Sequence, residues 1–300
     1  MIEGDEGLTC GDPGCAHSQA ENAFKLFQSA PVLIAFDRTD TVCTPQAYES
    51  GAFYFPRTAT MTMELAREIV YGTSPVTVDN CKRFVEMVKA LASAPAVLII
   101  GSGSHGAGTE KLWSDTDIAR TGTDIYYSDS VDYIADAHYL PFKDQSFDGV
   151  WIQAVLEHVA DPPAVVAEIE RVLKPGGVVY AETPFMQQVH EGGYDFSRYT
   201  VTGHRYLFRN FDLERMGGNK GPGFVLAWAV KYFVWGLTRS KKAGIAAAIP
   251  FFLLARVADR FVSEKALWDG GSGVYFLGAK AAGPAISAAE LPKLYRGFQG

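Results

Sequence analysis

The chain has 300 residues and is acidic, with 27 Lys and Arg against 34 Asp and Glu and a net charge of −7. Hydrophobic residues make up 48%, which is ordinary for a chain that buries a core and excludes an intrinsically disordered protein. The negative balance argues against a chain built to coat nucleic acid, although it leaves room for a local basic patch.

Residues 1–57 are expected to form an N-terminal extension that is irregular apart from a strand over Pro31–Phe36. The first ten residues contain no apolar stretch, so we expect no signal peptide, and four cysteines are too few for a disulfide scaffold. Cys10, Cys15, His17 and Cys43 are zinc-ligand types, but the first pair is spaced more widely than usual. Reduced thiols without metal are favoured over a degenerate zinc-ribbon-like segment.

The middle of the chain is expected to be a sheet domain. Residues 58–93 predict a helical lead-in, and from Ala94 to about residue 220 predicted strands alternate with helices. Ala96–Ile100 and Phe147–Gln153 are continuous apolar runs, as in strands buried on both faces, and Val178–Thr183 follows an amphipathic helix. This alternation predicts a parallel, doubly wound α/β sheet.

Residues 221–270 differ in composition from the rest. Residues 221–262 are strongly apolar and carry six Lys and Arg against one Asp, so this segment is +5 and the remainder −12. We expect a helical insertion before a last strand at Gly271–Lys280, within a terminal segment of residues 271–300. Its uncharged stretch, Ala243–Ala255, is too short to cross a membrane. A lid over an apolar substrate, an interfacial membrane anchor and ordinary core or dimer interface all fit this composition.

A glycine turn follows the first buried strand. Gly101, Gly103 and Gly106 match G-x-G-x-x-G, which lets the backbone turn tightly and approach a ligand. Asp124 ends the next predicted strand, where a carboxylate can accept hydrogen bonds from both hydroxyls of a ribose. On these residues alone, a dinucleotide, an adenosine-type cofactor and a plain tight turn all stay open.

Four later motifs carry a family resemblance. They are Asp136–Phe142 (DAHYLPF), Ser146–Trp151 (SFDGVW), Leu156–His158 (LEH) and Arg171–Val178 (RVLKPGGV). With them, the sequence resembles the class I S-adenosylmethionine-dependent methyltransferases, in particular the methyltransferase type 11 or quinone C-methyltransferase-like branch. The resemblance covers about residues 94–211. It implies a Rossmann-like sheet of seven strands, six parallel and one antiparallel.

The resemblance also implies a cofactor site for S-adenosyl-L-methionine. It assigns Gly101 and Gly103 to the loop beside the amino-acid end of the cofactor, Asp124 to the ribose and Asp136 to the adenine. The residues expected to bind the cofactor are Gly101, Ser102, Gly103, Asp124, Ile125, Asp136, Ala137 and Gln153. Tyr126 and Tyr127 could pack on the adenine or belong to the core. The sequence departs from the family at Ile99, often acidic there, and at His105, often a glycine.

Methyl transfer needs alignment of acceptor, methyl carbon and sulfur, and it needs a general base only for some acceptors. His190 and His158 are the catalytic candidates, because both follow predicted strands at the edge where ligands bind. Tyr194, Asp195 and Arg198 are candidate substrate-binding residues. A packing role for His158 and a structural ion pair between Asp195 and Arg198 are the alternatives.

The sequence therefore predicts methyl transfer from S-adenosylmethionine to an unidentified acceptor, which could be a small molecule, a lipid or quinone, or a glycan intermediate. An NAD(P)-dependent oxidoreductase and a non-catalytic cofactor-binding partner protein are the alternatives. We expect a cytoplasmic protein without a metal site and without a nucleic-acid partner. Peripheral membrane contact through residues 221–262 and homodimer formation stay open.

Overall fold

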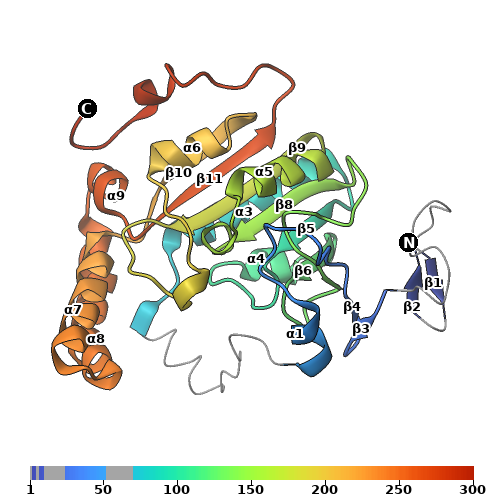
Figure 1. Cartoon of the computed structure of the whole chain (residues 1–300). Helices are drawn as coiled ribbons and strands as arrows, with labels where there is room; N and C mark the ends of the chain where they lie inside the picture. The colour runs from blue at the N-terminus through green and yellow to red at the C-terminus, as the bar shows by residue number, and fades with distance from the viewer. Residues whose placement is uncertain (1, 5–6, 10–23, 52–69) are drawn as a thin grey trace.

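The computed structural model describes residues 2–4, 7–9, 24–51 and 70–300. Its centre is a seven-stranded sheet in the order β10-β11-β9-β8-β5-β6-β7 (Figure 1). The strands are β5 (Ala96–Ile100), β6 (Ala119–Asp124), β7 (Tyr133–Ile134), β8 (Phe147–Gln153), β9 (Leu173–Pro184), β10 (Phe211–Asn219) and β11 (Gly273–Lys280).

Six of these strands run in one direction. β7, β6, β5, β8 and β9 pair in parallel, while β11 pairs antiparallel with both β9 and β10. The last strand of the chain thus lies between two earlier ones, and its reversed direction makes it the single antiparallel member. The fold class predicted from the sequence is confirmed.

Helices cover both faces of the sheet, which explains why the central strands are apolar throughout. Successive side chains of β5 point to opposite faces. Leu98 and Ile100 pack with α5 (Pro162–Val172) and with the end of α6 (Val201–Leu207), whereas Val97 and Ile99 pack with α3 (Pro75–Leu91) and α4 (Glu110–Ser114). A Cβ at Gly149 of β8 would lie 2.7 Å from Val88, so glycine there lets α3 lie close to the sheet.

Local sequence signals fix where the two long covering helices begin. The Ser74 hydroxyl accepts a hydrogen bond from the Thr77 backbone N–H and precedes Pro75. The Asp161 carboxylate accepts one from the Ala164 N–H and precedes Pro162. Capping residues followed by proline are typical helix starts.

The N-terminal region differs from its prediction. β1 (Ile2–Gly4) pairs with β2 (Gly7–Thr9), β3 (Leu26–Phe27) pairs with β4 (Ala30–Pro31), and α1 (Pro45–Ser50) follows. The strand predicted over Pro31–Phe36 is too long, because beyond Pro31 the segment makes one isolated bridge, from Val32 to Ile134 of the two-residue strand β7. Its apolar residues instead pack as a small cluster beside that sheet edge.

The cysteines lie in different parts of the chain. Cys10, Cys15 and His17 of the zinc-ribbon-like alternative lie outside the described residues. Cys43 and Cys81 are free thiols, and burial raises the pKa of each to about 11.

The expected insertion precedes β11 as three helices, α7 (Pro222–Thr238), α8 (Lys241–Ala258) and α9 (Glu264–Gly270). α7 and α8 form a hairpin at one end of the molecule (Figure 1). A Cβ at Gly244 would lie 2.5 Å from the Lys231 carbonyl oxygen, so this glycine allows close packing of the two helices. Short 3₁₀ helices occupy Leu156–His158, Gly192–Tyr194, Asp259–Phe261 and Leu291–Leu294. In the described part of the chain, no helix combines the length and apolar character needed to cross a membrane.

Candidate active site

A cavity of about 830 Å³ lies at the carboxyl ends of β5, β6 and β8, the edge where open α/β sheets bind ligands. Most of the predicted cofactor residues line it: Gly101, Gly103, Asp124, Ile125, Asp136, Ala137 and Gln153. Ser102 is fully buried behind this wall. The predicted catalytic residues His158 and His190 also line the cavity, together with Tyr194. Asp195 and Arg198 instead line a neighbouring surface depression.

The glycine turn is required by its surroundings. Gly101 has φ +80°, and its backbone N–H donates to the Thr123 carbonyl oxygen over 2.8 Å. A Cβ at Gly101 would lie 2.2 Å from Cγ2 of Val155, and one at Gly106 would lie 2.1 Å from Oε1 of Gln153. Gly101 therefore needs glycine, for its left-handed backbone and for its contact with Val155, whereas a side chain at Gly106 would displace the end of the Gln153 side chain.

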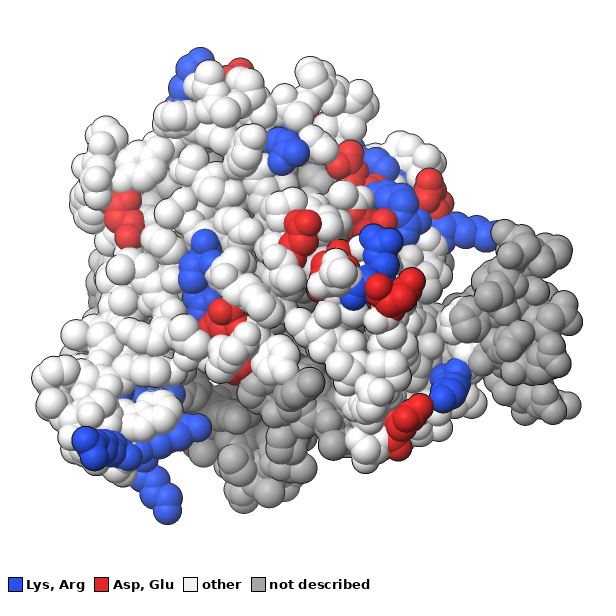
Figure 2. Space-filling view, in the orientation of Figure 1, with Lys and Arg blue, Asp and Glu red and all other residues white. Residues whose placement is uncertain are grey.

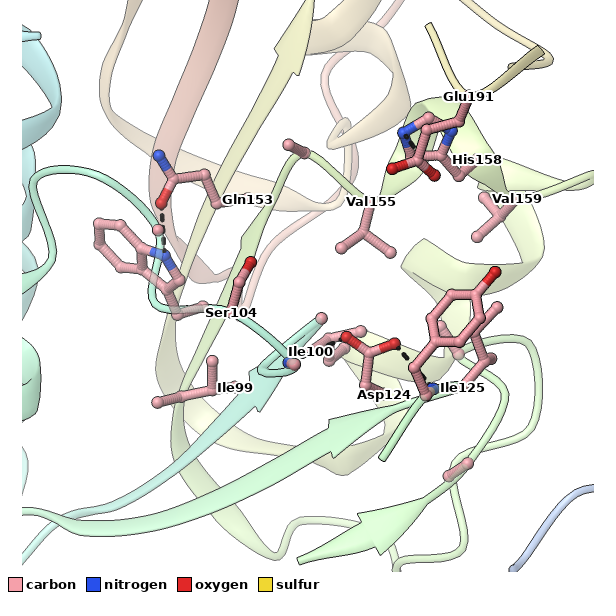
Figure 3. Close-up of a pocket in the computed structure, with 18 of the residues that line it drawn as sticks. Ile99, Ile100, Ser104, Asp124, Ile125, Gln153, Val155, His158, Val159 and Glu191 are labelled. Carbon is pink, nitrogen blue, oxygen red and sulfur yellow. Dashed lines mark hydrogen bonds and ion pairs between the residues drawn. The ribbon is translucent and has the colours of Figure 1, made fainter. Parts of the chain in front are cut away.

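Asp124 is held by the backbone at the end of β6. One carboxylate oxygen accepts from the Gly103 N–H over 2.9 Å, and the other accepts from the Tyr126 N–H over 3.1 Å. Each oxygen keeps further acceptor capacity. A fixed carboxylate on the cavity wall suits two adjacent hydroxyl groups of a ribose, and Figure 3 shows it between the labelled Ile100 and Ile125.

Asp136 is held by a side chain. Its Oδ1 lies 2.6 Å from Nδ1 of His138 and also accepts from the His138 N–H. Nε2 of His138 accepts from the Asp161 N–H over 3.1 Å, so we assign the Nδ1–H tautomer to the neutral ring. Burial alone would raise the pKa of Asp136, but the hydrogen bonds from His138 and Thr41 outweigh it and lower the pKa.

The departures from the family pattern have local explanations. The ring of His105 stacks on Trp113, with centroids 3.8 Å apart and planes 14° apart, so this contact orders the turn where the family often has glycine. Ile99 is buried under α3 and α4, a setting that favours an apolar side chain over an acidic one. Tyr126 lines the cavity, whereas Tyr127 packs against Phe27 and is outside the cavity wall.

The other end of the cavity gathers imidazole and carboxyl groups. Oε1 of Glu157 lies 3.6 Å from Nε2 of His158 and 3.7 Å from Nε2 of His190. The two imidazole rings meet edge to face, with centroids 4.8 Å apart. Figure 3 shows His158 and Glu191 facing each other, well separated from Gln153; Oε2 of Glu191 is 3.9 Å from Nε2 of His158.

The loop after β9 orients these histidines. Nδ1 of His158 lies 2.8 Å from the Tyr194 carbonyl oxygen, and Nδ1 of His190 lies 3.4 Å from Oδ2 of Asp195. Asp195 also accepts from the His190 backbone N–H and from both terminal nitrogens of Arg198. Burial would lower the pKa of His190, but the Glu157 and Asp195 carboxyls outweigh it and raise the pKa.

Two of the sequence expectations are altered by this geometry. Asp195 and Arg198 form the ion pair that the sequence left as an alternative, so their contact with substrate stays a prediction. Sequence reasoning assigned no role to Glu157 or Glu191. The signal for Glu157 was available in the LEH motif, since a glutamate next to a cavity histidine on one helical turn can share its site. No sequence signal placed Glu191 there, because a loop brings it in.

Known proteins match the central part of the chain. Residues 60–181 match the family model of the methyltransferase domain. The demethylmenaquinone methyltransferase of Clavibacter sepedonicus is 34% identical over 115 residues, 37% of this chain and 46% of that protein. The ubiquinone/menaquinone biosynthesis C-methyltransferase UbiE of Saccharophagus degradans is 39% identical over 69 residues, 22% of this chain and 28% of that protein. The chain thus matches less than half the length of either relative.

Among solved structures, a putative sarcosine dimethylglycine methyltransferase from Galdieria sulphuraria is similar with a TM-score of 0.46 and 15% identity, over 73% of this chain and 97% of that one. That likeness is too distant to bear on function. The sheet order, the glycine turn and the acidic residue ending β6 agree with the fold that the resemblance to class I methyltransferases implies. The match over residues 60–181 identifies this part of the chain as similar to the methyltransferase domain, and it supports S-adenosylmethionine as the cofactor.

Proposed function

We propose that the chain transfers a methyl group from S-adenosylmethionine to an acceptor bound beside His158 and His190. One observation carries the proposal: a single cavity joins the glycine turn, Asp124 and Asp136 to the two histidines. S-adenosylmethionine supplies an electrophilic methyl group next to a sulfonium leaving group. The cavity volume is in the range of small-molecule cofactor sites.

Residues of the chain would hold the cofactor at two carboxylates. Asp124 accepts hydrogen bonds from the ribose hydroxyls, while its bonds to the backbone of Gly103 and Tyr126 keep it in place. Asp136 accepts from the adenine amino group, and His138 keeps it oriented. The Gly101 turn leaves room for the backbone to approach the cofactor.

The acceptor would bind at the histidine end. An acceptor hydroxyl or acidic carbon loses a proton as the new bond forms, and His190 or His158 can take that proton. Glu157 and Asp195 on either side of His190 stabilise its protonated form. The Tyr194 carbonyl fixes the ring of His158.

For the acceptor, we propose a hydroxylated ring on a lipid tail, such as a hydroquinone. The support is the partial similarity to proteins named as quinone methyltransferases and the surface of the α7–α8 hairpin. This hairpin touches the histidine loop, because the Tyr232 hydroxyl donates to the Val189 carbonyl oxygen over 2.5 Å. No described residue of the hairpin lines the cavity, so the cavity gives no support to the alternative in which this segment is a lid over the substrate.

The hairpin suits an anionic lipid surface. It exposes large apolar side chains, with Phe233 68%, Leu237 71% and Leu254 63% accessible. Arg239, Lys241 and Lys242 lie at its turn, and Figure 2 shows basic side chains gathered at that end of the molecule. The one acidic side chain of residues 221–262, Asp259, accepts hydrogen bonds from the Gly223 and Phe224 backbone N–H groups at the start of α7. Apolar and cationic groups together are typical of interfacial helices.

Flotation with vesicles of anionic and of neutral lipid tests this docking. Replacing Arg239, Lys241 and Lys242 with Gln should weaken binding to anionic vesicles by about 3 kcal/mol at low salt, at about 1 kcal/mol per cation. The matched control replaces the exposed Lys82, Lys265 and Lys293 and should bind like the wild type. Equal vesicle binding by both triple variants would refute the proposal that the hairpin docks on an anionic membrane. Dimers that form with rising protein concentration, without vesicle binding, would show that the hairpin surface binds a second copy of the chain.

Turnover with methyl-labelled S-adenosylmethionine tests the reaction. The acceptors are a hydroquinone with an isoprenoid tail and a cell extract separated into lipid, glycan and protein. We expect label in the hydroquinone and the lipid fraction, and less label with His190→Ala. Label only in glycan or protein would overturn the acceptor class. No product despite cofactor binding would favour a non-catalytic partner protein.

A further inference from the structure

Glu157 stands out among the acidic residues of the cavity region. Its side chain is fully buried, and neither carboxyl oxygen has a hydrogen-bond partner in the described part of the chain. The nitrogens of His158 and His190 lie 3.6 and 3.7 Å from Oε1, which is beyond hydrogen-bond distance. A buried carboxylate that has two imidazoles near it but accepts no hydrogen bond from any described residue is unfavourable, so a positive charge at this point, on an imidazole or on a bound cation, would relieve a cost already present in the fold.

We propose that Glu157, His158 and His190 bind a divalent transition-metal ion, with Zn²⁺ fitting best. One ligand atom from each residue can be chosen so that all three lie within 4.8 Å of one another. Zinc binds imidazole nitrogen and carboxylate oxygen at about 2.0–2.2 Å, so a tetrahedral site separates its ligand atoms by about 3.3–3.6 Å. The two distances from Oε1 are close to that spacing before any side chain moves.

The groups behind the histidines match those of metal ligands. A metal-bound histidine usually gives its other ring N–H to a carboxylate or a backbone carbonyl, which fixes the ring and its tautomer. Here Nδ1 of His158 lies 2.8 Å from the Tyr194 carbonyl oxygen, and Nδ1 of His190 lies 3.4 Å from Oδ2 of Asp195 without forming a hydrogen bond in the described chain. Arg198 holds Asp195 in turn. Both Nε2 atoms are thereby turned toward Glu157.

The site would keep an open side toward the cavity. His158 and His190 line the cavity wall, while Glu157 lies behind them. Glu191 faces the same space, with Oε2 3.9 Å from Nε2 of His158, and its backbone has the left-handed φ of 59°. Non-glycine residues rarely adopt this left-handed conformation, and those that do are often found at functional sites. A fourth position remains for Glu191, water or an oxygen of the acceptor.

Ligand chemistry selects the kind of ion. Two imidazoles with one carboxylate suit zinc and its first-row neighbours, whereas magnesium and calcium prefer all-oxygen sites. A histidine nitrogen that binds the ion cannot also take a proton. If the ion binds, the histidines act on the acceptor through the metal, which makes a bound hydroxyl more acidic. In that respect the inference deepens the proposed function.

Metal titration of the purified 300-residue chain is the test. After dialysis against chelator, Zn²⁺ should bind at one equivalent, and Co²⁺ should give visible absorption bands of a four- or five-coordinate ion. Glu157→Gln and the double change His158→Asn with His190→Asn should weaken binding at least about 100-fold, and Asp195→Asn about 10–100-fold. His105→Asn is the matched control, since it also lines the cavity but lies outside the cluster. It should bind like the wild type.

Thermal unfolding gives a second readout that needs no activity. Without metal and at alkaline pH, where His190 is neutral, Glu157→Gln should unfold at a higher temperature than the wild type, because a neutral amide replaces a buried carboxylate that accepts no hydrogen bond from the described residues. Zn²⁺ should stabilise the wild type and leave Glu157→Gln unchanged. Equal metal affinity in the wild type and Glu157→Gln, or a lower unfolding temperature for metal-free Glu157→Gln, would overturn the inference.

S-adenosylhomocysteine binding, measured on the same samples, separates this inference from the proposed function. Cofactor binding without metal binding would refute the metal site alone. Metal binding without any cofactor binding would refute the methyl-transfer proposal and leave the metal site standing.

Discussion

The two ends of the cavity treat their acidic side chains differently. At the cofactor end, Asp124 accepts two backbone N–H groups and Asp136 accepts a histidine N–H. At the histidine end, Glu157 is more deeply buried than either, and both of its oxygens lack partners in the described chain. The carboxylates of the cofactor end are hydrogen-bonded before a ligand arrives, whereas Glu157 has two imidazoles near it and accepts no hydrogen bond within the described residues.

The difference follows from which elements build each end. Asp124 ends strand β6, and hydrogen bonds from the Gly101 and Ser102 backbone N–H groups to the Thr123 carbonyl oxygen tie the glycine turn to the same strand. Glu157 lies on a single 3₁₀ turn, and the groups that face it are His158 of the same turn and His190 of the loop after β9. We infer that the cofactor end supplies a preformed binding surface.

The largest expected effect comes from filling the glycine turn. Gly101→Ala adds a methyl group 2.2 Å from Val155 at a φ of +80°. We expect a loss of stability of about 2–5 kcal/mol from overpacking and backbone strain, and S-adenosylhomocysteine binding too weak for calorimetry. Gly176→Ala is the control, since it has φ +73° and no neighbour within 4 Å. It should lose only about 1–2 kcal/mol of stability and keep its affinity.

Removing the ribose carboxylate should have the next largest effect. Asp124→Ala is expected to weaken S-adenosylhomocysteine binding by about 1.5–3 kcal/mol, because charge-assisted hydrogen bonds are lost. Calorimetry measures the change, and Asp129→Ala, an exposed aspartate on the following loop, is the control. Unchanged affinity in Asp124→Ala would show that the ribose binds elsewhere.

Asp136 should respond oppositely to Glu157. Asp136→Asn should lower stability by about 1–2 kcal/mol at neutral pH, because a charged acceptor of the His138 N–H is lost. The lowered pKa of Asp136 sets the pH dependence. The difference in the free energy of unfolding between Asp136→Asn and the wild type should reach its full size above pH 3.8, the ordinary aspartate pKa. It should vanish as the pH falls through the lowered pKa of Asp136. Denaturant unfolding from pH 6 to pH 2.5 measures it, and a pH-independent difference would contradict this account.

The smallest effect concerns the link between the hairpin and the histidine loop. Tyr232→Phe removes the hydrogen bond to the Val189 carbonyl and should cost at most about 0.5–1 kcal/mol. Faster hydrogen exchange confined to residues 187–199 would reveal it, whereas Phe233→Tyr on the exposed side of α7 should leave that exchange unchanged. Equal exchange in both variants would show that the hairpin does not order the loop.

Much of the fold could be predicted, because it depends on local patterns. Apolar runs such as Ala96–Ile100 identified buried strands. The resemblance carried by the four motifs implied a sheet of seven strands with one antiparallel member, and β11 is that strand. The end of the strand at Pro31 could not be predicted, since it depends on how short its neighbour β7 is. The Asp195–Arg198 pair was foreseen as an alternative from its spacing. The role of Glu157 was missed, because its lack of partners is a property of packing.

Calorimetric binding of S-adenosylhomocysteine to the purified chain, with NADH as the competing candidate, tests the central claim most directly. We predict one binding site for S-adenosylhomocysteine, an affinity that falls with Asp124→Ala but not with Asp129→Ala, and no heat from NADH. Binding of NADH with no response to S-adenosylhomocysteine would contradict the assignment and favour an oxidoreductase on the same fold.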